Sequence, residues 1–355
     1  MSISTLSFNT STRTSLLKLQ STLSEASQEV NSGRHADIGR TLGRLTGSAI
    51  SARAQQTTFK EQQTSNLIVS TRLDNIEASM ATVTEGAESL ANNLIGAGLS
   101  TAYGTIADQA NSGIQQMTAA LNAKSGQYLF GGDNTDVQPI KTDAAALATR
   151  SAATAANLAA FVQAATGTSD ISKVTADQMK AYLSTTGFTG GTPSATHKFS
   201  DLFNDTNWAA NWSTASNGTI DSPISKTETI TGSATANDQS IRSIASAYTM
   251  LSSIDLGSLS EATRTAVTEI AATQLKTGTD RITALRADVG TKLKRIESAD
   301  AELLRQQDIM EATVDSLESV DITEASLRVN ALKTQLETAY TVTGKIQSLS
   351  LLNYI

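Results

Sequence analysis

Two long stretches of this chain repeat apolar residues at alternating spacings of three and four, the pattern of an α-helix that buries one narrow stripe against a partner helix. The first stretch has this spacing at Leu73, Ile76, Met80, Val83, Ala87, Leu90, Leu94 and Ala97. The second has it at Ile322, Ala325, Val329, Leu332, Leu336, Ala339, Thr343 and Ile346. A shorter run near the start has similar spacing at Leu16, Leu19, Leu23, Ala26 and Val30. We therefore expect a mainly α fold, with an elongated antiparallel helical or coiled-coil stem built from both chain ends.

The interior of the chain has a different composition. All three prolines lie between Pro139 and Pro223, and so do both tryptophans, Trp208 and Trp212. Proline interrupts helices, so these helix breakers mark a separate domain inserted into the stem. Aromatic residues make up only 4% of the chain, which favours helix seams over thick globular cores elsewhere.

Local patterns predict a small mixed α/β or β-rich fold for this inserted part. Residues Ala144 to Ala165 and Ile171 to Leu183 have helical spacing, whereas Ile224 to Ile230 alternates as a strand does. Asn237 or Asp238 is expected to cap the helix that returns the chain to the stem. We divide the chain into terminal helical arms (1–42 and 315–355), a helical stem domain (43–138 and 250–314) and an inserted outer domain (139–249).

Several function classes find no support in the sequence. The net charge is −7 without a basic cluster, which argues against nucleic acid as a partner. The chain has no cysteine and only two histidines, His35 and His197, placed in different expected domains. We find no nucleophile, P-loop or dinucleotide motif, and we expect no enzyme activity, no cofactor and no metal site. No stretch of about 18 apolar residues and no cleaved signal peptide is recognisable, so membrane insertion is not expected.

Motifs at both ends resemble the flagellin superfamily. Ile3-Ser4-Thr5 and the later run Glu29-Val30-Asn31-Ser32-Gly33-Arg34 resemble the start of these proteins, in which a helix ends in a Ser-Gly-basic turn. Asp321-Ile322-Thr323-Glu324-Ala325 and the ending Leu351-Leu352-Asn353-Tyr354-Ile355 are similar to their C-terminal helix. The ending and the internal Tyr128-Leu129-Phe130-Gly131-Gly132 look more like the hook-associated protein 3 branch than filament flagellin. One departure is His35 to Arg40, where the family has an Asn-Pro or Asp-Asp run.

The resemblance implies a structural axial protein of the bacterial flagellum, extracellular and exported through the flagellar type III apparatus. It implies an adaptor at the hook-filament junction, on which flagellin polymerises. The implied partners are hook-associated protein 1, flagellin, copies of the chain itself in a ring, and an export chaperone on the C-terminal arm.

The candidate site is an interface between subunits rather than a catalytic centre. Because isolated helical seams are marginally stable, the terminal arms are expected to order fully against neighbouring chains, although a monomeric bundle would use the same residues as its core. Our candidates for subunit contacts are Leu16, Leu19, Leu23, Val329, Leu332, Leu336, Ile346 and Leu352. Two alternative functions remain open. The chain could be a filament flagellin, or it could be a secreted or surface protein that binds a ligand such as a glycan. The second alternative requires Trp208 and Trp212 to be exposed, whereas both could equally fill the core of the middle domain.

Overall fold

The computed structural model describes residues 5–96 and 103–352, with side chains described for residue 7 and for 10–95 and 103–345. The fold is mainly α, with long antiparallel helices and a small insertion that carries two-stranded sheets, which confirms the expected fold class. The chain divides into two compact units. One comprises residues up to Gln63 and from Ala301 onward, and the other comprises Thr64–Asp300. The long helices α3 (Thr46–Gly96) and α9 (Glu261–Glu318) contribute residues to both units.

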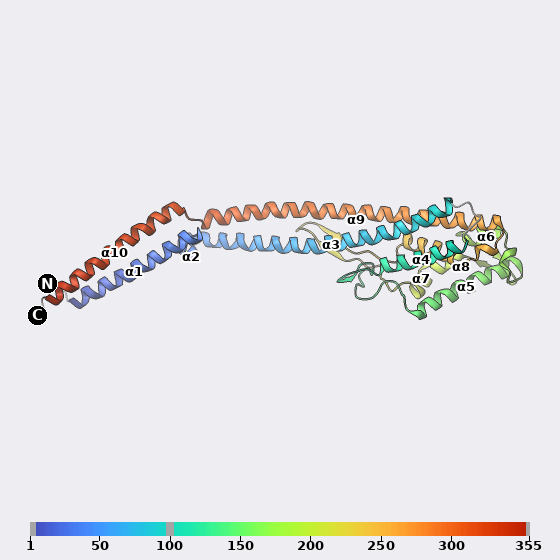
Figure 1. Ribbon diagram of the computed structural model, residues 1–355, viewed down its shortest axis with the longest axis horizontal. Coiled ribbons are helices and arrows are strands. Elements are labelled where there is room, and N and C mark those ends of the chain that lie inside the picture. The colour runs from blue at the N-terminus through green and yellow to red at the C-terminus, as the bar shows by residue number, and fades with distance from the viewer. Residues whose placement is uncertain (1–4, 97–102, 353–355) are drawn as a thin grey trace. The chain divides into compact units, whose positions relative to one another are not determined.

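The first unit is built from helices of the two chain ends. Its helix α1 (Thr5–Ser32) runs antiparallel to α10 (Ile322–Leu352), and the two lie side by side in Figure 1. Two short elements, α2 (Ile38–Leu42) and the 3₁₀ helix η1 (Gly43–Leu45), lead from α1 into α3. Within this unit α3 also pairs with α9, as the Gln307 Nε2 to Gln63 Oε1 hydrogen bond of 2.7 Å shows.

The second unit continues the α3–α9 pair and adds the insertion. The predicted seam of α3 is its buried face, since Leu73 and Ile76 are each 1% exposed and Ala87 is fully buried. The Arg286 Nη2 to Glu77 Oε1 contact of 2.6 Å joins the two helices on their solvent side. Between them the chain forms, in order, α4 (Tyr103–Leu121), β1 (Lys124–Ser125), β2 (Gln127–Tyr128), α5 (Ala144–Thr166), η2 (Ile171–Lys173), α6 (Ala176–Leu183), β3 (Phe188–Gly190), β4 (Ala195–His197), η3 (Phe199–Phe203), α7 (Asp205–Asn211), β5 (Asp221–Pro223), β6 (Thr229–Thr231), α8 (Gln239–Ser253) and η4 (Leu256–Ser258).

Each pair of successive strands forms its own two-stranded antiparallel sheet. The strand expected over Ile224 to Ile230 is wrong in its extent, because residues 224–228 form the turn between β5 and β6. The Ile224 N–H donates to the Glu228 carbonyl at 2.9 Å and closes this turn. The apolar residues at the two ends of this run, Ile224 and Ile230, are both buried, at 0% and 3% exposure, and a turn lies between them. Two buried ends therefore give the sequence a pattern that resembles a strand.

The insertion has an aromatic core. Phe161 of α5 stacks on Tyr182 of α6 with ring centroids 3.9 Å apart, and Trp208 stacks on Trp212 at 5.2 Å. Trp208 is 1% exposed and Trp212 is 5% exposed, so both fill the core, as one of the two readings of the sequence expected. The expected helix over Ala144 to Ala165 is α5, and Asp238 caps α8 by accepting a hydrogen bond from the Ser240 N–H at 2.8 Å.

Candidate functional site: the terminal helical pair

The contact between α1 and α10 contains the described candidate residues. Leu16, Leu19 and Leu23 are half-buried on α1, as are Val329, Leu332 and Leu336 on α10. Ala26 and Ala325, at 2% and 1% exposure, are the most buried alanines of the two seams. A side-chain hydrogen bond from Gln20 to the Tyr340 hydroxyl also joins the helices. Ile346 and Leu352 lie in α10, but their side chains are outside the described part of the chain.

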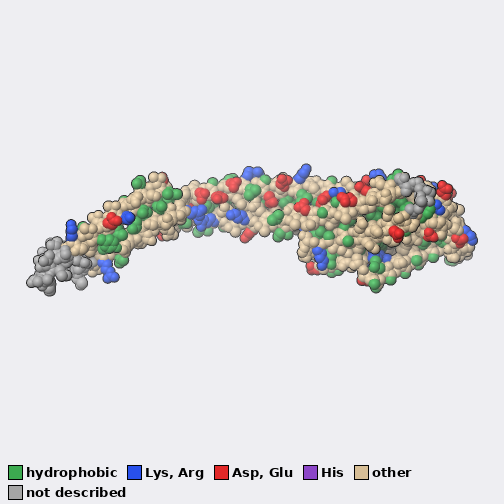
Figure 2. Space-filling model, in the orientation of Figure 1, with side chains coloured by type: hydrophobic (Ala, Val, Ile, Leu, Met, Phe, Trp, Pro, Cys, Tyr) green, Lys and Arg blue, Asp and Glu red, His purple; other side chains and the backbone are tan. Residues whose placement is uncertain are grey.

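The pair leaves other apolar side chains uncovered. Leu17 of α1 is 56% exposed, and Leu327 and Val342 of α10 are 67% and 49% exposed. In Figure 2, hydrophobic side chains are visible on the surface of this pair. The seam therefore accounts for only part of the apolar surface that these two helices present.

A joint connects the α1/α10 pair to the α3/α9 pair within the same unit. Helix α1 ends at Ser32 and α9 ends at Glu318, and the segments after these ends run antiparallel. The His35 N–H donates to the Glu318 carbonyl at 2.9 Å, and the Val320 N–H donates to the Gly33 carbonyl at 3.0 Å. Gly33 has a φ of +68°, a conformation that glycine adopts without steric penalty. The two helix breaks are therefore hydrogen-bonded to each other.

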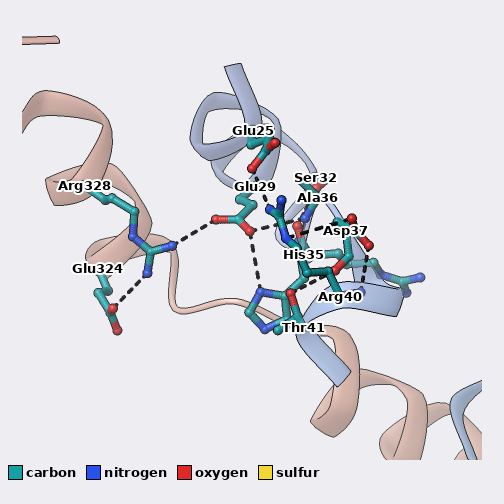
Figure 3. A network of polar contacts seen from close by, with 11 residues as sticks. Glu25, Glu29, Ser32, His35, Ala36, Asp37, Arg40, Thr41, Glu324 and Arg328 are labelled. Carbon is teal, nitrogen blue, oxygen red and sulfur yellow. Dashed lines mark hydrogen bonds and ion pairs between the residues drawn. The ribbon is translucent and has the colours of Figure 1, made fainter. Parts of the chain in front are cut away.

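Two buried carboxylates hold this joint together. The Glu318 side chain is 2% exposed and pairs with Arg53 and, at 3.5 Å, with Nη1 of Arg34. The Glu29 carboxylate lies 3.6 Å from His35 Nδ1 and 3.3 Å from Arg328 Nη1, as Figure 3 shows. A buried carboxylate needs such partners, because burying it without a counter-charge is costly. Glu29 thus connects the end of α1 to the first turns of α10.

Aspartates begin the helices on both sides of the joint. Asp37 caps α2 by accepting a hydrogen bond from the Arg40 N–H at 2.8 Å. Asp321 caps α10 by accepting from the N–H groups of Glu324 and Thr323, at 3.2 and 2.8 Å. Those two hydrogen bonds lower the pKa of Asp321, since they favour the ionised carboxylate. The Arg40 guanidinium pairs with Glu25 at 2.7 Å, and this contact raises the pKa of Arg40.

Sequence reasoning identified the seam but not the joint. The charged residues of the joint are far apart in the chain: 284 positions separate Arg34 from Glu318, and 299 separate Glu29 from Arg328. The available signal was the placement of charged residues beside both helix breaks, at Glu29 to Arg34 and Glu318 to Asp321.

Within residues 5–96 and 103–352, no three Asp, Glu or His side chains are grouped so that they could hold a metal ion. No helix of the described ranges is both long and apolar enough to cross a membrane. Burial raises the pKa of Tyr182 and of Tyr248, so both are neutral core phenols.

Two comparisons with known proteins bear on this pair. Residues 273–355, which include most of α9 and the whole of α10, match the family described as the bacterial flagellin C-terminal helical region. A solved structure assigned as a flagellar hook-associated protein from Vibrio parahaemolyticus shares the fold with a TM-score of 0.50 and 10% sequence identity. That alignment covers 77% of this chain and 97% of the other. No curated protein matches the sequence.

The family match agrees with the resemblance seen at the C-terminal end of the chain. The solved structure adds a likeness of fold, at 10% sequence identity.

Proposed function

We propose that this protein is an axial component of the bacterial flagellum that serves as the adaptor at the hook-filament junction, on which flagellin polymerises. The observation that carries this proposal is the α1/α10 pair, a thin two-helix contact with apolar residues left exposed on both members. A two-helix pair of this kind is marginal by itself, and covering its exposed apolar side chains would stabilise it. Helix α10 lies wholly in the region that matches flagellin.

The adaptor role requires two kinds of neighbour. We propose hook-associated protein 1 on one side, flagellin on the other, and copies of this chain in a ring. The proposed subunit contacts remain the seam residues and the apolar C-terminal turns, including Ile346 and Leu352. The described seam residues are half-buried on helices α1 and α10, which pack together, so subunit contacts would extend this seam rather than replace it.

The rest of the chain fits an arm-and-body organisation. We propose the division into terminal arms (1–42, 315–355), stem (43–138, 250–314) and outer domain (139–249), and the joint at residues 33–37 and 319–321 supports its boundary between arms and stem. Export through the flagellar type III apparatus, with a chaperone covering the apolar C-terminal arm before assembly, belongs to the same proposal.

Deletion of the gene tests the adaptor role. We expect cells with hooks but no filaments by electron microscopy, and flagellin monomers released into the medium. Filaments of normal length and number on the deletion strain would refute the adaptor role.

A substitution in the seam tests the site. Leu332→Asp places a carboxylate on the half-buried face of α10, at a cost of about 2 kcal/mol or more. We expect the variant to restore no filaments in the deletion strain, although the protein is still produced. Leu332→Met is the matched control, since a volume-conserving apolar exchange preserves the seam. Normal filaments with Leu332→Asp would contradict the assigned role of the seam.

A filament flagellin is the second candidate function, because the matched family is that of flagellin itself. The purified protein distinguishes the two. A flagellin self-polymerises into long filaments on seeds of its own fragments, whereas an adaptor forms no long filament alone and instead restores flagellin growth on hooks. The glycan-binding alternative is not favoured, since Trp208 and Trp212 are both buried.

A further inference from the structure

An apolar cavity of about 180 Å³ lies inside the unit formed by residues 64–300. Helices α3, α8 and α9 provide its main apolar walls, and α4, Phe130 and the segments 217–219 and 233–235 complete the lining. The wall residues are Leu73, Ile76, Met80, Ile241, Ile282 and Val289. None of these six residues is more than 7% exposed, so the deep walls of the cavity are buried, while its mouth opens to solvent.

The size and lining of the cavity define what it can hold. Protein interiors are close-packed, and voids larger than a water molecule are few. An apolar cavity of about 150 Å³ stays free of water and binds benzene, because an enclosed water molecule needs two to four polar partners. The six wall residues carry no hydrogen-bonding side chain, and the volume here is larger than that reference. Against these six walls an apolar group is therefore favoured over ordered water, whereas Ser233, Thr235 and Ser240 place hydroxyl groups elsewhere in the lining.

The mouth of the cavity is polar, but its charges are compensated. Its exposed members are Asn217, Thr219 and Asp288. Asp288 is paired with Lys292 at 2.8 Å, and Asp238 is engaged as the cap of α8. The remaining polar groups at the mouth are amide and hydroxyl groups. A charged ligand would find no unpaired counter-charge there, whereas a neutral ligand with one polar atom would find hydrogen-bonding partners.

We propose that this cavity is a binding site for a small, uncharged, largely apolar molecule about the size of a benzene or indole ring, with any polar atom directed to the loop at residues 217–219. The site is independent of the flagellar role, since every residue that lines it belongs to the unit 64–300 and none to the α1/α10 pair.

Methionine methyl groups provide the test in the full-length chain. The sequence contains six methionines, and Met80 is the one among the lining residues. In protein labelled with ¹³C at the methionine methyl groups, titration with benzene or indole is expected to shift the Met80 resonance saturably. The Met179 and Met310 resonances, from α6 and from the other unit, are expected to stay unchanged. Met80→Leu assigns the resonance by removing it.

A filling substitution provides the control for location. Leu285 lines the cavity and is half-buried, whereas its neighbour Ala284 on α9 is exposed. Leu285→Trp is expected to weaken binding at least tenfold, and Ala284→Trp is expected to leave it unchanged. The proposal is overturned if the Met80 resonance does not respond in the unaltered chain, if all methionine resonances shift together without saturation, or if folded Leu285→Trp binds as before. Should Leu285→Trp fail to fold, the titration of the unaltered chain still decides.

Discussion

Replacement of Gly113 by alanine tests how tightly α4 packs on α8. A Cβ atom at Gly113 would lie 2.5 Å from both Cε1 and Cζ of Tyr248, and 3.0 Å from its hydroxyl oxygen. Tyr248 is 1% exposed, so its ring has no solvent to move into. Gly290 of α9 is the matched control, since a Cβ added there meets no atom within 4 Å.

The expected changes have opposite signs. Alanine is favoured over glycine inside a helix by about 0.5–1 kcal/mol, so Gly290→Ala should stabilise the protein by that amount. Gly113→Ala gains the same helical preference but overpacks the interface with Tyr248, at a cost of about 1–3 kcal/mol. The net effect of Gly113→Ala is therefore a destabilisation of about 0–2.5 kcal/mol, centred near 1 kcal/mol. The difference between the two variants isolates the contact with the ring.

Urea unfolding followed by tryptophan fluorescence measures this effect. The only two tryptophans, Trp208 and Trp212, lie in the same unit as both glycines and stack on each other. In a Tyr248→Leu background the penalty of Gly113→Ala should disappear, because the ring that causes it is gone. If Gly113→Ala stabilises the chain as much as Gly290→Ala does, the packing of α4 on α8 is looser than described and the reasoning fails.

Two further predictions concern the joint. Glu318→Ala removes the carboxylate between Arg34 and Arg53, and it should lower the free energy of unfolding by about 1–2 kcal/mol and speed amide hydrogen exchange in α10. Glu302→Ala, at an exposed site, is the control and should change neither the stability nor the exchange rate. Equal exchange rates in the two variants would refute the role of Glu318. The pKa of Asp321 is lowered in the folded chain, so its stabilising effect is present above the pKa of the unfolded chain, near 4, and is lost as pH falls through the lower folded value. Asp321→Asn should remove this part of the acid dependence of helix content, measured by circular dichroism from pH 6 to pH 2, and an unchanged acid profile would contradict it.

The helices of the stem could be predicted from the sequence because their cause is local. The seam of α3 has one apolar residue every three or four positions, and those from Leu73 to Leu94 are all buried in the structure. The start of α5 and the cap of α8 also follow from local signals, since Asp143 and Asp238 both accept hydrogen bonds from backbone N–H groups of their helices. The three-domain division and the subunit contacts remain predictions.

Contacts between distant residues were beyond sequence reasoning. The buried ion pairs of the joint depend on two helix breaks that lie opposite each other only in the folded chain. The turn at residues 224–228 was interpreted as strand because burial of Ile224 and Ile230 imitates strand alternation. A helix far away in the sequence contacts this turn, since Asn66 Nδ2 of α3 donates a hydrogen bond of 3.0 Å to the Ile224 carbonyl. A local pattern cannot distinguish these two causes.

The pairing of α1 with α10 has a consequence for the order of folding. The hydrogen bond between Gln20 and Tyr340 spans 320 positions, so the face of α1 that packs on α10 has no native partner helix until α10 has been synthesised. Native contacts of such large sequence separation form slowly, because a long loop must close before they can be made. The unit 64–300 can gain most of its core earlier, since its contacts lie within itself. During synthesis, the unit 64–300 would therefore be folded while α1 still lacks α10, and the apolar side chains of α1 would be open to contacts with other apolar surfaces.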